Sequence, residues 1–233
     1  RKLRKRLKAA EALLGGLRDG AAPEAAADAA APKAPLPVSP LAPAGGFPAL
    51  PVIDGVSFAT TAAGVRYSGR TDVMLAALVP GTTLAGAFTR SQTRAASVLD
   101  CEAKLAADGG SGSGSGSGSA AGAAILVNSG NANAFTGAAG QASVDAVTGA
   151  VAAALGVPAE RVLSSSTGVI GEPLPHERIV AAVEGLAAGL DPAGIAAAAQ
   201  AIMTTDTFPR GPRPRSPATA ARSASPASPR GRG

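Results

Sequence analysis

The sequence predicts an α/β fold with mixed layers, in which a β-rich N-terminal part precedes strand–loop–helix units. Two observations lead to this prediction. After residue 47, large apolar residues and turn glycines recur at intervals typical of short strands. From residue 123 onward, compact apolar runs alternate with Ala-rich stretches whose larger apolar residues recur at helical spacing.

The β-rich part begins where large apolar residues such as Val56 and Phe58 appear together with turn glycines. Apolar runs bounded by glycine or proline are typical of strands. Pro80 and Gly81 form a turn signal between the last two runs. We therefore expect short strands near residues 56–60, 64–68, 73–79 and 84–90.

The later part is expected to alternate strands and helices. Residues 141–155 contain many Ala residues, few charges and Val at helical spacing, and Gly156 is a typical helix stop. Residues 128–133 are polar and fit neither period, so a loop is expected there. The other expected elements are a helix at 94–107, strands at 123–127 and 161–164, and helices near 175–189 and 191–203.

Composition divides the chain into a core and flexible extensions. Residues 1–46 combine a basic amphipathic segment with an Ala/Pro-rich linker, and residues 211–233 contain only Pro, Arg and small residues. Such segments bury too little apolar surface to fold. We expect one folded part at 47–210 with a flexible Gly/Ser loop at 109–119. The composition of residues 211–233 fits a genuine tail and a shifted reading frame equally well.

The positive charge of the chain lies in these extensions. Residues 1–46 carry eight Lys/Arg and four acids, and residues 211–233 carry five Arg and no acid, so residues 47–210 have a net charge of −4. A mildly acidic core with one Tyr and no Trp does not suggest a nucleic-acid partner. Residues 1–18 fit a solvated extension better than a mitochondrial targeting segment, because Glu11 and Asp19 are atypical of such acid-poor segments.

Several site classes are disfavoured by composition. One Cys and one His cannot form an intramolecular disulfide or an ordinary Cys/His zinc site. No apolar run approaches the roughly 20 residues needed to cross a membrane. We expect a soluble protein of a reducing compartment, with no metal and no membrane partner.

Three polar strings follow apolar elements, at Asn128, Ser164 and Thr204. In the second, Thr167 and Gly168 could direct a hydroxyl and a main-chain amide at one oxygen, as stabilisation of a tetrahedral oxyanion requires. The alternative is an ordinary strand-to-helix turn, in which Ser, Thr and Gly are common. Likewise, Asn128–Asn133 could be a loop whose amides bond its own main chain.

Taken together, these strings resemble a known family. NSGNANAFTG at 128–137, SSTGVIGEPLP at 165–175 and AIMTTDTFPR at 201–210 resemble motifs of the ornithine acetyltransferase family in order and spacing. The stretch at 64–98 resembles the N-terminal region of that family. The resemblance spans about residues 38–210, the N-terminal portion of such a protein.

The resemblance implies acetyl transfer from N-acetylornithine to glutamate in arginine biosynthesis, and in some members synthesis of N-acetylglutamate from acetyl-CoA. No other cofactor is implied. Members cut themselves into two chains, and the second begins with the Thr that forms the acyl-enzyme. The implied location is the bacterial cytoplasm, or the mitochondrion if the source is eukaryotic.

By resemblance, Thr167 and Gly168 match the oxyanion hole of the family, and Thr204 matches a Thr that contacts substrate. The nucleophilic Thr and the Lys before it have no match, because residues 211–233 replace that region. An oxyanion hole without an attacking group leaves only residual catalysis. We therefore expect this chain alone to be inactive unless a second chain supplies the Thr.

No other residue is expected to replace the nucleophile. Thr205 and Thr207 have no neighbouring base. Asp206 is interpreted as a loop cap, His176 as a capping or solvated residue at a helix start, and Cys101 as packed or exposed without reactivity. Two other functions stay open: a non-catalytic binding module of the same family, and a related self-processing hydrolase.

Overall fold

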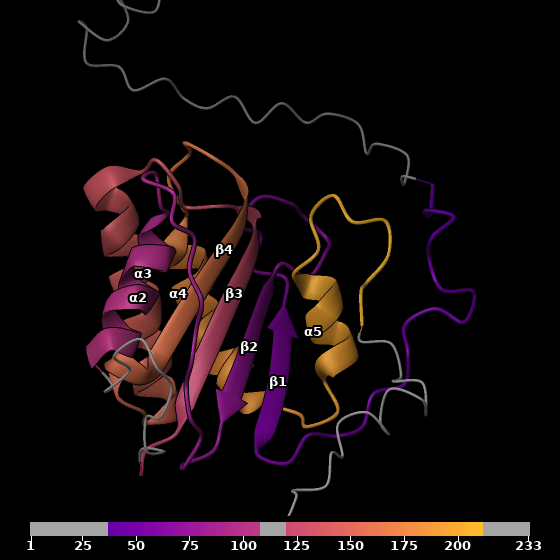
Figure 1. Ribbon diagram of the computed structural model, residues 1–233, viewed down its shortest axis with the longest axis horizontal. Coiled ribbons are helices and arrows are strands. Elements are labelled where there is room, and N and C mark those ends of the chain that lie inside the picture. The colour runs from indigo at the N-terminus through magenta and orange to yellow at the C-terminus, as the bar shows by residue number, and fades with distance from the viewer. Residues whose placement is uncertain (1–36, 108–119, 212–233) are drawn as a thin grey trace, which may run out of the picture. The chain divides into compact units, whose positions relative to one another are not determined.

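The computed structural model describes residues 37–107 and 120–211. Within them, four strands form one sheet in the order β1-β2-β3-β4 (Figure 1). Neighbouring strands are antiparallel except β3 and β4, which are parallel. The sheet is therefore mixed, and together with its helices it confirms the predicted α/β class. The strands are β1 (Val56–Thr61), β2 (Val73–Leu78), β3 (Ala123–Asn131) and β4 (Val162–Val169).

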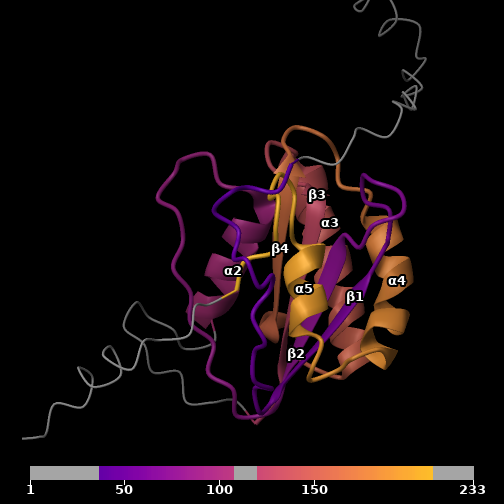
Figure 2. The ribbon, with the colours of Figure 1, turned by 90° about the vertical axis from the view of Figure 1, so that its right-hand side faces the viewer.

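Four α-helices surround this sheet. Figure 1 shows α2, α3 and α4 on one side of the strands and α5 on the other, beside β1, and Figure 2 shows the same helices after a quarter turn. A short 3-10 helix, Ala159–Arg161, leads into β4. The helices are α2 (Ala96–Ala107), α3 (Gly137–Leu155), α4 (His176–Ala188) and α5 (Ile195–Ala201).

The hydrophobic core lies between one face of the sheet and helices α3 and α4. Leu75 and Leu126 are register partners on β2 and β3, and both are fully buried. They belong to one cluster with Val151 of α3 and Ile179 of α4. Each large side chain buried in this way contributes about 1.5–3 kcal/mol. This face therefore supplies most of the apolar stabilisation of the described fold.

Helix α2 protects the free edge of the sheet at β4. The Cys101 thiol donates a hydrogen bond to the Ser164 carbonyl (3.2 Å), and Lys104 Nζ donates to the Val162 carbonyl (3.0 Å). Lys104 also pairs with the Asp100 carboxylate at 2.9 Å. Unpaired carbonyls on an edge strand would otherwise be open to other strands. Two side chains of α2 thus close this edge.

The second face of the sheet is less completely covered. Side chains alternate along a strand, so Ser129 points away from the face that carries Leu126. Its hydroxyl donates to the Ala201 carbonyl at the end of α5 (2.8 Å), which places that end of α5 on the second face. The larger apolar residues of this face are only half-buried: Met74, Ile125, Val127 and Leu163.

The strand predicted at 64–68 is wrong, and a buried carboxylate explains why. The side chain of Asp72 is fully buried and accepts hydrogen bonds from the main-chain amides of Ala63 (2.7 Å) and Val65 (2.6 Å). These bonds hold the segment as a loop ahead of β2. Gly64 and Gly69 adopt positive φ within it, which also interrupts a strand.

The strand predicted at 84–90 is also wrong. This segment lies against α2 and forms no strand. Its closeness to α2 is seen at Gly86, where an added Cβ would lie 2.8 Å from the Leu105 side chain. The turn predicted at Pro80 and Gly81 is confirmed, with a main-chain hydrogen bond from Thr82 to Val79 (3.3 Å).

The remaining elements are confirmed with changed boundaries. The loop predicted from Asn128 is wrong as far as Asn131, since β3 continues to pair with β4 through those residues. Helix α3 starts four residues before its predicted beginning. Helix α5 is shorter than predicted, because Asp191 pairs with Phe58 of β1 before the helix begins. Of the extensions predicted at 1–46, 109–119 and 211–233, only residues 37–46 and 211 are described, and the Ser39 amide bonds Thr207 Oγ1 (3.1 Å); the rest lie outside the described residues.

Replacing Leu126 by Ala should lower the free energy of unfolding by about 2–5 kcal/mol, because it opens a cavity in the core. Urea denaturation followed by circular dichroism measures this change. The control is Leu41→Ala, at a side chain that is 82% exposed, for which we expect less than about 0.5 kcal/mol. Equal effects of the two substitutions would contradict the core assignment.

Candidate functional site

The candidate oxyanion residues lie at the carboxyl end of β4. Thr167 is the register partner of Ser129, and Gly168 is the register partner of Gly130 on β3. The interpretation of residues 164–168 as a simple strand-to-helix turn is therefore wrong, because they belong to a strand.

Gly168 cannot carry a side chain in this position. A Cβ there would lie 2.2 Å from the Gly130 carbonyl carbon and 2.6 Å from the Asn131 nitrogen, and the φ of Gly168 is 136°. On the partner strand, a Cβ at Gly130 would lie 2.9 Å from the Cβ of Arg66. The main chains of β3 and β4 thus approach each other closely beside Thr167, and glycine is required for this approach.

Thr167 and Gly168 are open to a ligand. Thr167 is half-buried and Gly168 is exposed. Within the described residues, no hydrogen bond of the Thr167 hydroxyl is found. A hydroxyl without a partner beside an exposed glycine main chain can donate to an incoming oxygen at little cost, since no internal bond has to break.

Buried amides hold this end of the sheet. The Ser166 hydroxyl donates to Asn128 Oδ1 (2.7 Å), and Asn128 Nδ2 donates to the Asn131 carbonyl (2.9 Å). Asn128 is 2% exposed. Ser166, the residue before Thr167, is therefore held by hydrogen bonds. Because the amide of Asn128 has partners, its burial costs less free energy than that of an unpaired amide.

The network extends to the starts of α3 and α4. Asn131 Nδ2 donates to the carbonyls of Glu172 and Pro173, both at 3.1 Å. Asn133 Nδ2 donates to the Gly140 carbonyl (2.9 Å), and Asn133 has a φ of 46°. The interpretation that these Asn side chains bond main chain is confirmed, whereas a left-handed backbone angle occurs among them only at Asn133.

Thr204 lies in the loop after α5 and is half-buried. Two contacts hold this loop: the Ser129 hydroxyl bonds the Ala201 carbonyl, and the Arg70 guanidinium donates to the Met203 carbonyl. Because Ser129 pairs with Thr167 across the strands, it links the two predicted site segments. Ser129 lies in the 128–137 motif and Arg70 in the 64–98 stretch, but the sequence predicted no role for either, because their partners are main-chain carbonyls distant in the chain.

The other polar residues of the 204–210 loop have structural contacts. Thr207 Oγ1 accepts a hydrogen bond from the Ser39 amide (3.1 Å), and Asp206 pairs with Arg210 at 3.2 Å. Asp206 was expected to cap the loop, and its contact is this ion pair. Thr205 is exposed. None of these three residues is arranged as an activated nucleophile.

The contacts of His176 and the burial of Cys101 indicate structural roles. His176 begins α4, and its Nδ1 lies 3.0 Å from the Ser143 hydroxyl of α3, so it joins two helices. Burial raises the pKa of the Cys101 thiol above its ordinary value of 9.0. A buried thiol with a raised pKa is a poor nucleophile at neutral pH.

Across residues 37–107 and 120–211, no group of three or more His, Cys, Asp or Glu side chains could hold a metal ion. In the same segments, no helix is both long enough and apolar enough to cross a membrane.

A cavity of about 300 Å³ lies beside β4. It is lined by Ser165 and Ser166 of β4, Val98 of α2 and Phe88 of the preceding loop. Because Ser166 precedes Thr167, a ligand reaching this strand would meet a partly apolar space next to the candidate donors.

Comparison with known sequences identifies similar proteins. A family model described as "ArgJ family" matches residues 57–219. The arginine biosynthesis bifunctional protein ArgJ of Ruegeria pomeroyi is 64% identical over 75% of the chain, and that of Gluconobacter oxydans is 48% identical over 77%. The chain spans only 40% and 39% of the length of these relatives.

Two solved structures resemble the fold. The ornithine acetyltransferase of Mycobacterium tuberculosis, crystallised with ornithine, has a TM-score of 0.58 and 38% identity, and the match covers 66% of this chain and 77% of that one. The bifunctional ArgJ protein of Bacillus halodurans has a TM-score of 0.57 and 30% identity, with 66% and 75% covered. The resemblance drawn from the sequence motifs is thus confirmed.

Substituting Gly168 by Ala should lower the free energy of unfolding by about 3 kcal/mol or more, because the new Cβ forces β3 and β4 apart. The matched control is Gly171→Ala, which has a positive φ of 86° but open space around its Cβ. We expect Gly171→Ala to lower the free energy of unfolding by about 1 kcal/mol, from backbone strain alone. Urea unfolding compares the two, and similar losses would contradict the close strand approach.

The Cys101 thiol should make stability fall at alkaline pH. The unfolded thiol loses its proton near its ordinary pKa of 9.0, whereas burial raises the pKa of the folded thiol. The unfolded chain therefore binds fewer protons above pH 9, and the free energy of unfolding declines as pH rises. The difference between wild type and Cys101→Ala in urea unfolding from pH 7 to 10 isolates this effect. An unchanged difference would contradict the burial of the thiol.

Proposed function

Because the chain belongs to the ArgJ family, we propose that it forms the oxyanion-stabilising part of an acetyltransferase that moves the acetyl group of N-acetylornithine to glutamate in arginine biosynthesis. The observation that carries this proposal is the position of Thr167 and Gly168 at the open end of β4. Their donors serve the acetyl oxygen when it becomes negatively charged.

The chemistry takes place in two steps. A Thr hydroxyl attacks the acetyl carbonyl, the amide C–N bond breaks, and ornithine leaves after gaining a proton on its amine. The amine of glutamate then attacks the resulting acetyl ester and releases the Thr hydroxyl. Each step passes through a tetrahedral oxyanion, so the same two donors stabilise both transition states.

The attacking Thr belongs, in this proposal, to the rest of the protein. The chain corresponds to about two fifths of the curated ArgJ relatives, and its own Thr205 and Thr207 lack a base. The half-buried apolar residues on the second face of the sheet support the same view, since an additional layer would cover them. We expect a second chain to provide both this layer and the nucleophile.

The substrates and location follow from the same proposal. Ornithine is the ligand of the M. tuberculosis structure, so N-acetylornithine is the expected acetyl donor and Thr204 its expected contact. Acetyl-CoA is the second expected donor, for synthesis of N-acetylglutamate. No dissociable cofactor enters either reaction, and the bacterial cytoplasm is the expected compartment.

Replacing Thr167 by Val should lower kcat about 10²–10³-fold with little change in KM, because the hydroxyl acts mainly in the transition state. The assay measures acetyl transfer from N-acetylornithine to glutamate by this chain produced together with its second chain. Thr204→Val should instead raise KM. The control Thr205→Val, at an exposed hydroxyl, should leave both constants unchanged.

The 233-residue chain assayed alone should show essentially no acetyl transfer, because no group is present to attack the substrate. Addition of a second chain beginning with Thr should restore activity. Full activity of the chain alone would contradict the proposal that the nucleophile comes from elsewhere. An inactive mixture of both chains that binds N-acetylornithine would favour a non-catalytic binding module.

A further inference from the structure

The loop before β2 lies against the carboxyl end of β3, next to the candidate oxyanion residues. A Cβ added at Gly130 would lie 2.9 Å from the Cβ of Arg66 and 3.5 Å from Cε2 of the Tyr67 ring. Gly130 is also the register partner of Gly168. The Tyr67 ring therefore lies directly beside the main-chain segment of β3 that contacts Gly168.

The same loop places a guanidinium over this ring. The buried carboxylate of Asp72 holds the start of the loop through two main-chain amides. A bend follows at Gly69, whose φ of 77° is rare for residues with a side chain. The guanidinium carbon of Arg70 then lies 5.2 Å from the centroid of the Tyr67 ring, a distance at which a cation is attracted to an aromatic face. These two residues form the Tyr67/Arg70 pair.

Arg70 connects this pair to the segment that follows α5. Its guanidinium donates a hydrogen bond to the carbonyl of Met203, which lies 133 residues later in the chain. A guanidinium is planar, so it can stack on a ring and donate from its edge at the same time, which an ammonium group cannot do. Met203 directly precedes Thr204. The bond therefore holds the peptide next to a candidate site residue.

This bond is the long-range restraint nearest to Thr204 in the described residues. The other two long-range hydrogen bonds of the loop lie three residues away on either side: Ser129 holds the Ala201 carbonyl (2.8 Å), and Thr207 Oγ1 accepts a main-chain amide (3.1 Å). A loop held only at those two points would have to be ordered when a ligand binds, and this ordering weakens affinity. Arg70 provides the order in advance.

We infer that the Tyr67/Arg70 pair positions Thr204 for the substrate. The ring supports the guanidinium, the guanidinium fixes the peptide before Thr204, and the ring itself lies beside the strand partner of Gly168. Arg70 is thus a positioning residue that acts on the substrate through Thr204. The substrate contact of Thr204 rests on the proposed function, whereas the restraint of its loop does not.

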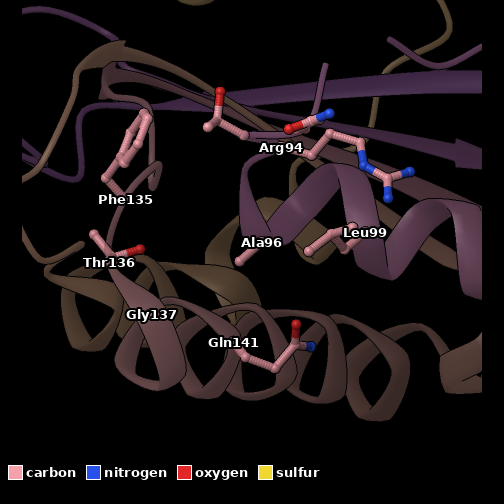
Figure 3. A pocket seen from close by; sticks show the side chains of 9 residues that line it. Arg94, Ala96, Leu99, Phe135, Thr136, Gly137 and Gln141 are labelled. Carbon is pink, nitrogen blue, oxygen red and sulfur yellow. The ribbon is translucent and has the colours of Figure 1, made fainter. Parts of the chain in front are cut away.

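The cavity shown in Figure 3 is a separate feature. It has a volume of about 570 Å³ and lies between the starts of α2 and α3, with Arg94, Phe135 and Gln141 among its lining residues. The Tyr67/Arg70 pair does not line it. Its side chains carry both donors and acceptors, so they select no single class of ligand. The role of the pair therefore does not depend on this cavity.

The first test is kinetic and uses this chain produced together with its second chain. Arg70→Met keeps the length of the side chain but removes its donors, and it should raise the KM for N-acetylornithine about 10-fold while changing kcat less than about 3-fold. Tyr67→Leu removes the ring face and should also raise KM, whereas Tyr67→Phe keeps the face and should retain most of the affinity.

Arg66→Met is the matched control from the same loop. Arg66 pairs with Glu172, and more than a third of each side chain is exposed, so this ion pair contributes little. The KM of this variant should stay within about 2-fold of wild type. A KM increase as large as that of Arg70→Met would overturn the inference, because any change in the loop would then have the same effect.

A double-mutant cycle separates positioning from a merely structural role. In a Thr204→Val background, Arg70→Met should raise KM by less than about 2-fold more, because the group through which Arg70 acts is already absent. A further increase of about 10-fold would overturn the inference, since Arg70 would then act on the substrate directly or on stability alone.

Hydrogen exchange of the same co-produced chains tests the restraint without catalysis. In Arg70→Met, peptides that cover residues 202–207 should exchange about 10-fold faster than in wild type, because local opening becomes easier. Peptides from β3 should keep their rates. Unchanged exchange at 202–207, or faster exchange throughout the described fold, would overturn the inference.

These measurements distinguish failure of this inference from failure of the proposed function. If the wild-type chains transfer no acetyl group, the proposed function fails, and the same cycle is measured by calorimetry on the dissociation constant of N-acetylornithine. Coupling between Arg70 and Thr204 there supports the inference, and absence of binding by wild type overturns it. Acetyl transfer with independent effects of the two residues supports the proposed function and overturns only the positioning role.

Discussion

The close approach of β3 and β4 at Gly130 and Gly168 is the constraint on which the rest of the structure depends. A Cβ on Gly168 would lie 2.2 Å from the Gly130 carbonyl carbon, so these parallel strands keep their spacing only because Gly168 has no side chain. The contact sets the register that places Thr167 opposite Ser129. Ser129 in turn bonds the end of α5, and thereby positions the loop that carries Thr204. One main-chain contact thus determines how the candidate site residues are arranged.

Buried amides extend this constraint to the helices. Asn128, Asn131 and Asn133 are each at most 3% exposed, and their side chains bond main-chain atoms of β3, α3 and the start of α4. An amide buried without partners would cost about 1–3 kcal/mol, so the network stabilises the fold only as a satisfied whole. It supports β4, whereas the half-buried Thr167 hydroxyl has no hydrogen-bond partner among the described residues. The fixed side chain of Ser166 and the unpaired hydroxyl of Thr167 therefore belong to adjacent residues.

Periodicity predicted the elements that depend on local sequence. The helix at 141–155 and the strands near 56–60 and 73–79 were predictable because their apolar spacing and turn residues are local. The strand at 64–68 was predicted wrongly, because the buried carboxylate of Asp72 holds that segment through bonds that periodicity does not reveal. The motif matches located Thr167, Gly168 and Thr204. They contain Ser129 and Arg70 but did not predict the role of either, because these side chains bond main-chain carbonyls more than 70 residues away.

The two faces of the sheet explain why the chain is best understood with a second chain. One face is closed by α3 and α4, while the other keeps Met74, Ile125 and Val127 half-buried next to the candidate site. The most direct measurement is a crystal structure of both chains with N-acetylornithine. We expect the acetyl oxygen within about 2.7–3.1 Å of Thr167 Oγ1 and the Gly168 amide nitrogen. An acetyl group bound away from both atoms would contradict their role as oxyanion donors.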